Sequence, residues 1–242
     1  MKTYRIHLIR HGQTMGNAQG QYIGSTDLPL TTEGIKQLHH LKEIAQYPAA
    51  PVVFSSPLQR CLQTAEILYP DCRPIVVDDF RECDFGEYET KTAQELADDP
   101  RFSAWMDGGI KAAPPGGEST EQFVARCTAA FEKMVEGLMK TGVTDAAVCA
   151  HGGVICCILW AYGLPEREFY DWMCPNGRGY TLRITPGIWM RVGKAEVIQA
   201  LPIGAPEDRE EARILDTFRA AAHKADDALR SAGDAPSDSS QR

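Results

Sequence analysis

The sequence lacks the long apolar runs and the leader that would mark a membrane or secreted protein. None of the hydrophobic stretches in its 242 residues approaches the roughly 20 residues that a transmembrane helix needs. Residues 1–6 (MKTYRI) alternate polar and apolar side chains like a strand and have no extended apolar core of a signal peptide. We therefore expect a cytoplasmic protein with no membrane partner.

Cysteine pairs at metal-site or redox-motif spacing are also missing. The eight cysteines form no CxxC pair, and none is followed by a histidine at a metal-site spacing. Several lie in apolar runs, such as Cys149 in AAVCA, so we expect reduced cysteines that pack as small hydrophobic residues. The sequence predicts no metal site and no cofactor.

A basic surface is absent as well. The chain carries 25 Lys and Arg against 33 Asp and Glu, a formal net charge of −8, which argues against nucleic acid as the partner. An acidic average surface also repels small anions, so a local pocket of cations would be needed to bind one. We expect a small-molecule partner, and the oligomeric state is not predicted.

Alternating strand and helix patterns predict an α/β fold in a three-layer sandwich. Short apolar strands are expected at 3–9, 51–56, 74–77 and 145–150, with helices at 31–46, from Pro57, at 119–140 and at 152–162. Residues 84–118 are irregular with short helical pieces, and 180–184 with 189–200 should form a closing β pair. Strands that alternate with helices favour a mostly parallel central sheet with helices on both faces.

The pattern indicates one domain with two C-terminal additions. The domain is expected at residues 1–205. Residues 206–232 are rich in Glu, Arg, Ala and Asp and are expected to form a charged helix. Residues 233–242 have the Ser, Asp and Pro composition of a disordered tail.

Four segments with chemically active side chains follow the predicted parallel strands. The carboxyl ends of parallel strands meet at one edge of a sheet, where α/β folds bind ligands, so these segments should lie together. Each is a weak signal alone, but two histidines, two arginines and a carboxylate together indicate a catalytic site for an anion. The segments are LIRHGQT (8–14), SSPLQR (55–60), RECDFG (81–86) and AHGG (150–153).

In this order, the segments resemble the signature of the histidine phosphatase superfamily, in its phosphoglycerate-mutase-like branch. The likeness covers about residues 3–200, and DLPLT (27–31) and PPGGES (114–119) are similar to weaker landmarks of the family. Within this branch the sequence resembles α-ribazole phosphatases and broad-specificity phosphatases. The resemblance implies a phosphoglycerate mutase-like fold and a phosphoric monoester hydrolase of the histidine acid type.

The resemblance also implies a role for each residue of the set. His11 would be the nucleophile, Glu82 the general acid and His151 a further catalytic residue. The candidates for phosphate binding are Arg10, Asn17, Arg60 and Gly152. Separately from the resemblance, Tyr22, Ile23 and Tyr88 are candidates for the substrate pocket, with packing in the core or at the rim as the equal alternative for each.

The chemistry of these residue types fits such a site. Arginine forks match the geometry of a phosphate and stay charged. An imidazole with one unprotonated nitrogen can attack phosphorus, and a carboxyl of raised pKa can protonate the leaving oxygen. No metal is required for this chemistry.

Three functions remain open at this stage. They are a phosphomonoesterase for a small phosphorylated metabolite, a cofactor-dependent phosphoglycerate mutase, and a non-catalytic module that binds phosphorylated ligands. A mutase must hold a second anionic group, but Asp84, Glu87 and Glu89 make the stretch after Glu82 acidic. We therefore favour the phosphatase. Thr90 stands where relatives usually have Gly, and this departure leaves the substrate open.

Overall fold

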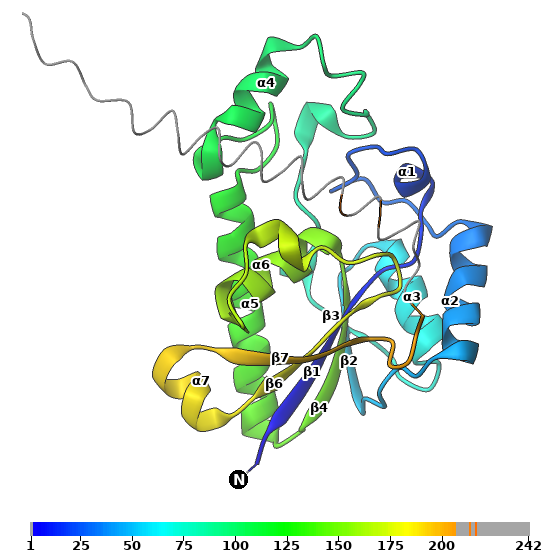
Figure 1. Ribbon diagram of the computed structural model, residues 1–242, viewed down its shortest axis with the longest axis vertical. Coiled ribbons are helices and arrows are strands. Elements are labelled where there is room, and N and C mark those ends of the chain that lie inside the picture. Colours follow the sequence, from blue (N-terminus) through cyan, green and yellow to red (C-terminus); the bar gives the residue numbers. More distant parts are fainter. Residues whose placement is uncertain (1, 207–212, 214–215, 217–242) are drawn as a thin grey trace, which may run out of the picture.

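Figure 1 shows the computed structural model of the chain, which describes residues 2–206, 213 and 216. Apart from residues 206, 213 and 216, the expected charged helix at 206–232 and the expected tail at 233–242 lie outside the described residues. No helix in the described part of the chain is both long and apolar enough to cross a membrane.

The centre of the fold is a seven-stranded sheet with the order β3-β2-β4-β1-β6-β7-β5. The strands β3, β2, β4 and β1 run parallel to one another, and β5 is parallel to β7. Only β6 is antiparallel to its neighbours, so the expectation of a mostly parallel sheet is confirmed. The strands are β1 (Tyr4–Arg10), β2 (Val52–Ser55), β3 (Ile75–Val76), β4 (Asp145–Ala150), β5 (Gly163–Leu164), β6 (Gly179–Ile184) and β7 (Ala195–Leu201).

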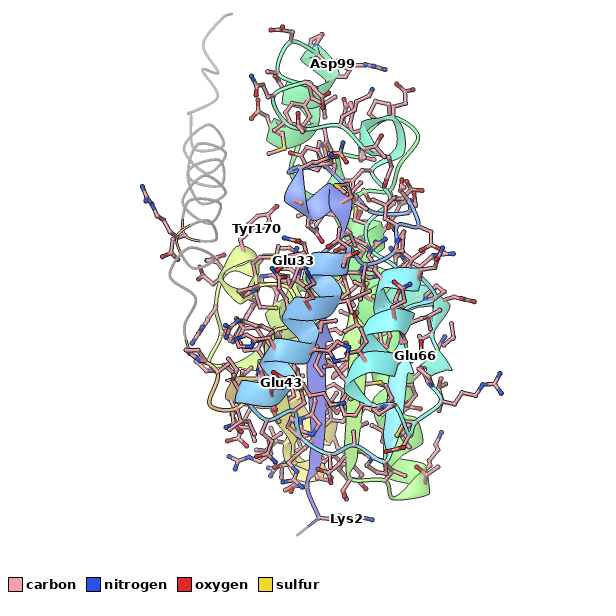
Figure 2. All side chains as sticks on the ribbon, turned by 90° about the vertical axis from the view of Figure 1, so that its right-hand side faces the viewer. Lys2, Glu33, Glu43, Glu66, Asp99 and Tyr170 are labelled. Carbon is pink, nitrogen blue, oxygen red and sulfur yellow. The ribbon has the colours of Figure 1, made fainter. Side chains whose placement is uncertain are left out.

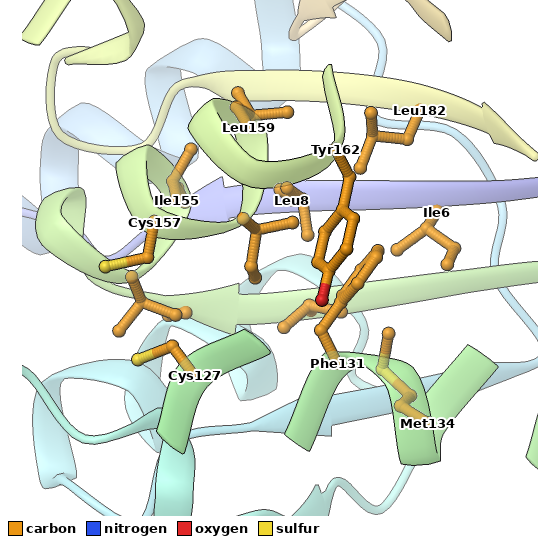
Figure 3. Packing of buried hydrophobic residues seen from close by; sticks show 14 of the residues in the cluster. Ile6, Leu8, Cys127, Phe131, Met134, Ile155, Cys157, Leu159, Tyr162 and Leu182 are labelled. Atoms are coloured by element: carbon orange, nitrogen blue, oxygen red, sulfur yellow. The ribbon is translucent and has the colours of Figure 1, made fainter. Parts of the chain in front are cut away.

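Helices cover both faces of this sheet, as the sequence pattern predicts. On one face, α5 (Thr120–Thr141) and α6 (Gly152–Tyr162) pack against Ile6 and Leu8 of β1, and Figure 3 shows this interior from close by. On the other face, α2 (Thr32–Ile44) and α3 (Gln59–Leu68) lie side by side (Figure 2). Alternate residues of β1 therefore serve two separate cores.

The long helix α5 begins and ends where its sequence indicates. Ser119 caps the N-terminus by accepting a hydrogen bond from the Gln122 N–H, and the Gln122 side chain returns a bond to the Ser119 backbone. Gly142 ends the helix in the left-handed conformation with φ of 75°.

One expected strand is partly wrong. Residues 189–192 belong to the helix α7 (Pro186–Val192), and the strand of the closing pair starts only at Ala195. Pro186 favours the first turn of a helix, and Gly193 ends it with φ of 62°. These two residues outweigh the apolar pattern of the segment between them.

The remaining elements are short. The helix α1 (Met15–Ala18) was not expected, whereas α4 (Pro100–Asp107) is one of the helical pieces expected in 84–118. The single-turn 3₁₀ helices are η1 (Asp78–Phe80), η2 (Gly86–Tyr88), η3 (Gly109–Lys111) and η4 (Phe169–Trp172). We call residues 84–118 the cap segment. Its helix α4 lies beyond the carboxyl end of β1 (Figure 1).

Candidate active site

The structure brings the four chemically active segments together at one edge of the sheet. His11 follows β1, Arg60 lies in the first turn of α3 after β2, and His151 follows β4. Glu82 follows β3 and η1. The rings of His11 and His151 meet edge to face with 5.2 Å between their centroids, and Arg60 Nε lies 3.2 Å from His151 Nδ1. The parallel topology is the cause, since β3, β2, β4 and β1 are neighbours with their carboxyl ends aligned.

The His11 ring is held in the form that a nucleophile needs. Its Nδ1 lies 2.6 Å from the Gly12 carbonyl oxygen, which can only accept a hydrogen bond, so Nδ1 carries the proton. The lone pair therefore sits on Nε2. Burial lowers the pKa of His11 well below its usual value, and the positive charges of Arg60 and Arg10 lower it further. The ring is consequently neutral at physiological pH.

The two arginines of the site have different attachments. Arg60 is fully buried and donates to the Thr26 and Gly24 carbonyl oxygens, both at 2.8 Å, as well as to His151. Arg10 donates from one terminal nitrogen to the Cys174 carbonyl at 2.7 Å. The Nε of Arg10 is buried and has no hydrogen-bond partner among the described residues. An unpaired buried donor on a charged group is costly, and an anion would satisfy it.

His151 is neutral, and both of its ring nitrogens make hydrogen bonds within the protein. Its Nδ1 accepts from Arg60 Nε, so the neutral ring carries its proton on Nε2, which lies 2.8 Å from Ser56 Oγ. Burial, followed by the charge of Arg60, lowers the pKa of His151 well below its usual value. In this arrangement His151 orients Arg60 and Ser56 beside the His11 ring.

The Glu82 carboxyl sits inside the site and bonds to two backbone N–H groups. Its Oε1 accepts from Cys83 and its Oε2 from Gly153, both at 3.0 Å. Burial raises the pKa of Glu82, while the two hydrogen bonds and the arginines Arg60 and Arg10 oppose the rise. The acid therefore keeps its proton to a higher pH than an exposed glutamate does.

Asn17 and Gly152 complete the set expected to bind phosphate. Asn17 uses its Oδ1 to accept from Thr14 N at 3.1 Å and from Asn176 Nδ2 at 3.3 Å, so its amide nitrogen remains to donate. Gly152 starts α6, and a Cβ there would lie 2.8 Å from Met173 Sδ and 3.4 Å from Arg10 Nε. The distance to Arg10 is ordinary contact, whereas the distance to Met173 is too short for a Cβ, so glycine lets this helix N-terminus pack against Met173.

A family comparison matches this geometry. The family model described as "Histidine phosphatase superfamily (branch 1)" matches residues 6–194, which include all the residues described above. The chain belongs to the histidine phosphatase superfamily.

Individual relatives agree with this assignment. An Escherichia coli adenosylcobalamin/alpha-ribazole phosphatase is 28% identical over 72% of this chain and 86% of its own length. A probable phosphoglycerate mutase GpmB of Yersinia pestis is 31% identical over 67% of this chain and 77% of its own length. A solved structure of a putative alpha-ribazole-5'-P phosphatase from Escherichia coli superposes with a TM-score of 0.68 at 26% identity, covering 84% of this chain and 99% of that one.

The acidic residues after Glu82 do not stand free at the edge of this histidine phosphatase site. Glu89 accepts hydrogen bonds from the backbone N–H groups of Gly24, Ser25, Thr26 and Phe85. Asp84 accepts from Ser25 Oγ and Gly86 N, and Glu87 pairs with Arg101 at 3.0 Å. These carboxylates hold the cap segment and the loop at 24–26 together. These contacts do not contradict the interpretation that the acidic stretch repels a second anionic group, which stays a prediction.

The three candidates for the substrate pocket lie close to one another, but they differ in exposure. Tyr22 is half-buried and packs on Phe85 and Trp105, with ring centroids 5.3 and 5.8 Å away. Ile23 is also half-buried and packs over Gly16. Tyr88 is fully buried between the rings of the cap segment, and this corrects the expectation that it lines the pocket. Its size fills the centre of the cluster, where it has no contact with solvent.

Several residues of the site were missed by the sequence reasoning. Asn176 donates to the His11 carbonyl at 2.9 Å as well as to Asn17, and its only signal is a Pro-Asn-Gly turn before β6. Arg126 and Glu118 bind the loop that carries Glu82, and Glu89 binds the 24–26 loop whose carbonyl groups accept from Arg60. Glu118 lies in the PPGGES segment and Glu89 in the acidic stretch, but neither signal indicates these contacts. In the described part of the chain, no group of three or more His, Cys, Asp or Glu residues could hold a metal ion.

Proposed function

We propose that this protein is a phosphomonoesterase that hydrolyses a small phosphorylated metabolite through a phosphohistidine on His11. The observation that carries the proposal is the hydrogen bond from His11 Nδ1 to the Gly12 carbonyl oxygen. It leaves the Nε2 lone pair free in a site that also contains two arginines and a carboxyl of raised pKa. A site that only bound phosphate would have no use for an imidazole with a free lone pair beside a carboxyl of raised pKa.

In the first step, the Nε2 lone pair of His11 forms a bond to phosphorus while the bond from phosphorus to the leaving oxygen breaks. The electron pair of that bond moves to the leaving oxygen, which takes the proton of Glu82. The charge of the transferring group is spread over its non-bridging oxygens, and Arg10 and Arg60 stabilise it electrostatically.

In the second step, the Glu82 carboxylate takes a proton from water. The resulting hydroxide forms a bond to phosphorus as the bond from phosphorus to His11 Nε2 breaks. The electron pair returns to the imidazole, inorganic phosphate leaves, and Glu82 is again protonated. His11 and Glu82 thus both regain their starting states.

The name of the Yersinia relative favours a second candidate, a phosphoglycerate mutase. A mutase has to bind a second anionic group beside the transferred phosphoryl group. Of the cations in the cap segment, Arg101 is taken by Asp99 and Glu87, and Lys91 and Lys111 are exposed. This distribution favours water as the acceptor and makes the mutase the second choice.

Two experiments test the proposal. Brief mixing with a ³²P-labelled monoester should give an acid-labile, base-stable phosphoprotein, and His11→Ala should lose both label and turnover. His39→Ala, which changes an exposed histidine on α2, is the matched control. Label that persists in His11→Ala would overturn the assignment of the nucleophile.

The second experiment separates phosphatase from mutase. Release of phosphate is followed with α-ribazole 5′-phosphate and with 3-phosphoglycerate, with and without added 2,3-bisphosphoglycerate. We expect phosphate release that does not depend on the bisphosphate. Isomerisation of 3-phosphoglycerate that outpaces phosphate release would show that the mutase is the correct function.

A further inference from the structure

Arg126 of α5 is bound to the loop that carries Glu82 through both of its terminal guanidinium nitrogens. One terminal nitrogen donates to the carbonyl oxygens of Asp79 and Arg81, both at 2.8 Å, and the other donates to the Glu82 carbonyl at 2.9 Å. The remaining donors of the fork bind both carboxylate oxygens of Glu118. A single side chain therefore holds the backbone of three residues at and before the general acid.

Glu118 fixes the other side of the same loop. Besides pairing with Arg126, it accepts a hydrogen bond from the Asp84 backbone N–H at 3.0 Å. The ion pair is mostly buried, with side-chain exposures of 20% for Arg126 and 18% for Glu118, so solvent screens it less than it screens a surface pair. The backbone is thus held on both sides of Glu82.

The same helix also supports the hydrogen-bond donor that the Glu82 carboxyl uses. The Arg126 guanidinium lies over the Phe123 ring at 4.9 Å from its centroid. Phe123 Cε1 in turn lies 2.9 Å from the position that a Cβ on Gly153 would take. Arg126, Phe123 and Gly153 therefore form one packed column beside the carboxyl group.

We propose that the Glu118–Arg126 ion pair is a positioning device for the general acid Glu82, and this inference rests on the proposed function. Neither residue touches the reacting atoms. Their effect is to hold the Glu82 carboxyl where it can reach the leaving oxygen. Such placement has to be accurate to about 0.5 Å for efficient catalysis.

The test uses the leaving-group dependence of hydrolysis. An alkyl phosphate needs a proton on its leaving oxygen, whereas p-nitrophenolate leaves without one. The variants are Arg126→Met, Arg126→Lys and Glu118→Gln. The matched control is Arg183→Met, because Arg183 makes the same two-pronged ion pair with Glu196 between β6 and β7, where both side chains are exposed.

We expect Arg126→Met to lower kcat for the alkyl phosphate by about 10- to 100-fold, part of the 10²- to 10⁴-fold range of general acid catalysis. The kcat for p-nitrophenyl phosphate should change far less, and Arg126→Lys should recover part of the loss. In a Glu82→Gln background, Arg126→Met should cause no further loss, because it acts through Glu82. Arg183→Met should leave both substrates unaffected.

Four results would overturn the inference. Equal losses for the two substrates, or losses that multiply in the Glu82→Gln background, would show that the pair has only a structural role. If Arg126→Met does not fold, Arg126→Lys and Glu118→Gln are judged by the ratio of kcat for the alkyl phosphate to kcat for p-nitrophenyl phosphate. If this ratio is the same as in the wild type for both variants, the positioning role is refuted. A wild-type protein that hydrolyses neither ester would refute the proposed function itself, and the positioning role with it.

Discussion

Replacement of Gly153 by alanine should disable Glu82, the proposed general acid, without removing it. A Cβ built on Gly153 lies 2.3 Å from Glu82 Oε1 and 2.9 Å from Phe123 Cε1. Ordinary contact begins at 3.4 Å, so the carboxyl must move by about 1 Å. The Gly153 N–H, which now donates to Glu82 Oε2 at 3.0 Å, would be misaligned with it.

The expected loss follows from that displacement. A misplacement of about 1 Å in a catalytic group can cost about 10²-fold in rate. We therefore expect Gly153→Ala to lower kcat for an alkyl phosphate by about 100-fold. For p-nitrophenyl phosphate the loss should be much smaller, because its leaving group needs no proton. The phosphohistidine should still form from this activated ester.

The assay compares kcat for the two esters in Gly153→Ala and in a matched control, Gly137→Ala. Gly137 lies in α5 with no heavy atom within 4 Å of a Cβ added there. Since alanine is the better helix former, this control should gain about 0.5–1 kcal/mol of stability and keep full activity. Equal losses for the two esters in folded Gly153→Ala protein would refute the reasoning.

Three further predictions concern stability, phosphate binding and metals. Burial lowers the pKa of His7 from 6.5 to about 4, so this group contributes stability above pH 6.5 that is lost as the pH falls toward 4. The loss is about 3 kcal/mol. Urea unfolding at pH 6.5 and at pH 4 should show a smaller loss of unfolding free energy in His7→Gln than in the wild type. An equal loss in the two proteins would contradict the assignment of this pH dependence to His7. Glu89→Gln should loosen the loop that binds Arg60 and weaken inhibition by inorganic phosphate about 10-fold, whereas Glu87→Gln should not. Activity should survive dialysis against EDTA, because arginines neutralise the phosphate; recovery only on adding Mg²⁺ or Zn²⁺ would contradict this.

The position of the candidate active site could be predicted, because in a parallel sheet the residues that directly follow the strands meet at one edge. Each of His11, Arg60 and His151 directly follows a strand or opens the helix after it. Once the strands are recognised as parallel neighbours, their carboxyl ends must converge. Glu82 is also reached this way, although the single turn of η1 lies between it and β3.

The supporting contacts could not be predicted, because they join segments that are distant in the chain. Glu89 binds backbone N–H groups at 24–26, and Arg126 binds carbonyl groups 44 to 47 residues before it. A backbone group has the same chemistry at every position, so the sequence contains no complementary pattern for such partners. For the same reason, the acidic run after Glu82 suggested a charged rim, although the structure uses these carboxylates as hydrogen-bond acceptors.

Burial is the largest cause of the opposite pKa shifts of His11 and Glu82, the proposed nucleophile and the proposed general acid. Removing His11 from water disfavours its cationic form and lowers its pKa, while removing Glu82 from water disfavours its anionic form and raises its pKa. One physical cause therefore favours the neutral form of both the base and the acid. Arg10 and Arg60 supply positive charge beside them, which favours the binding of a phosphate dianion. Activity would be lost as the pH falls through the pKa of His11, which gains a proton, and as it rises through that of Glu82, which loses one. The working range lies between these two values, and deeper burial of the pair widens it.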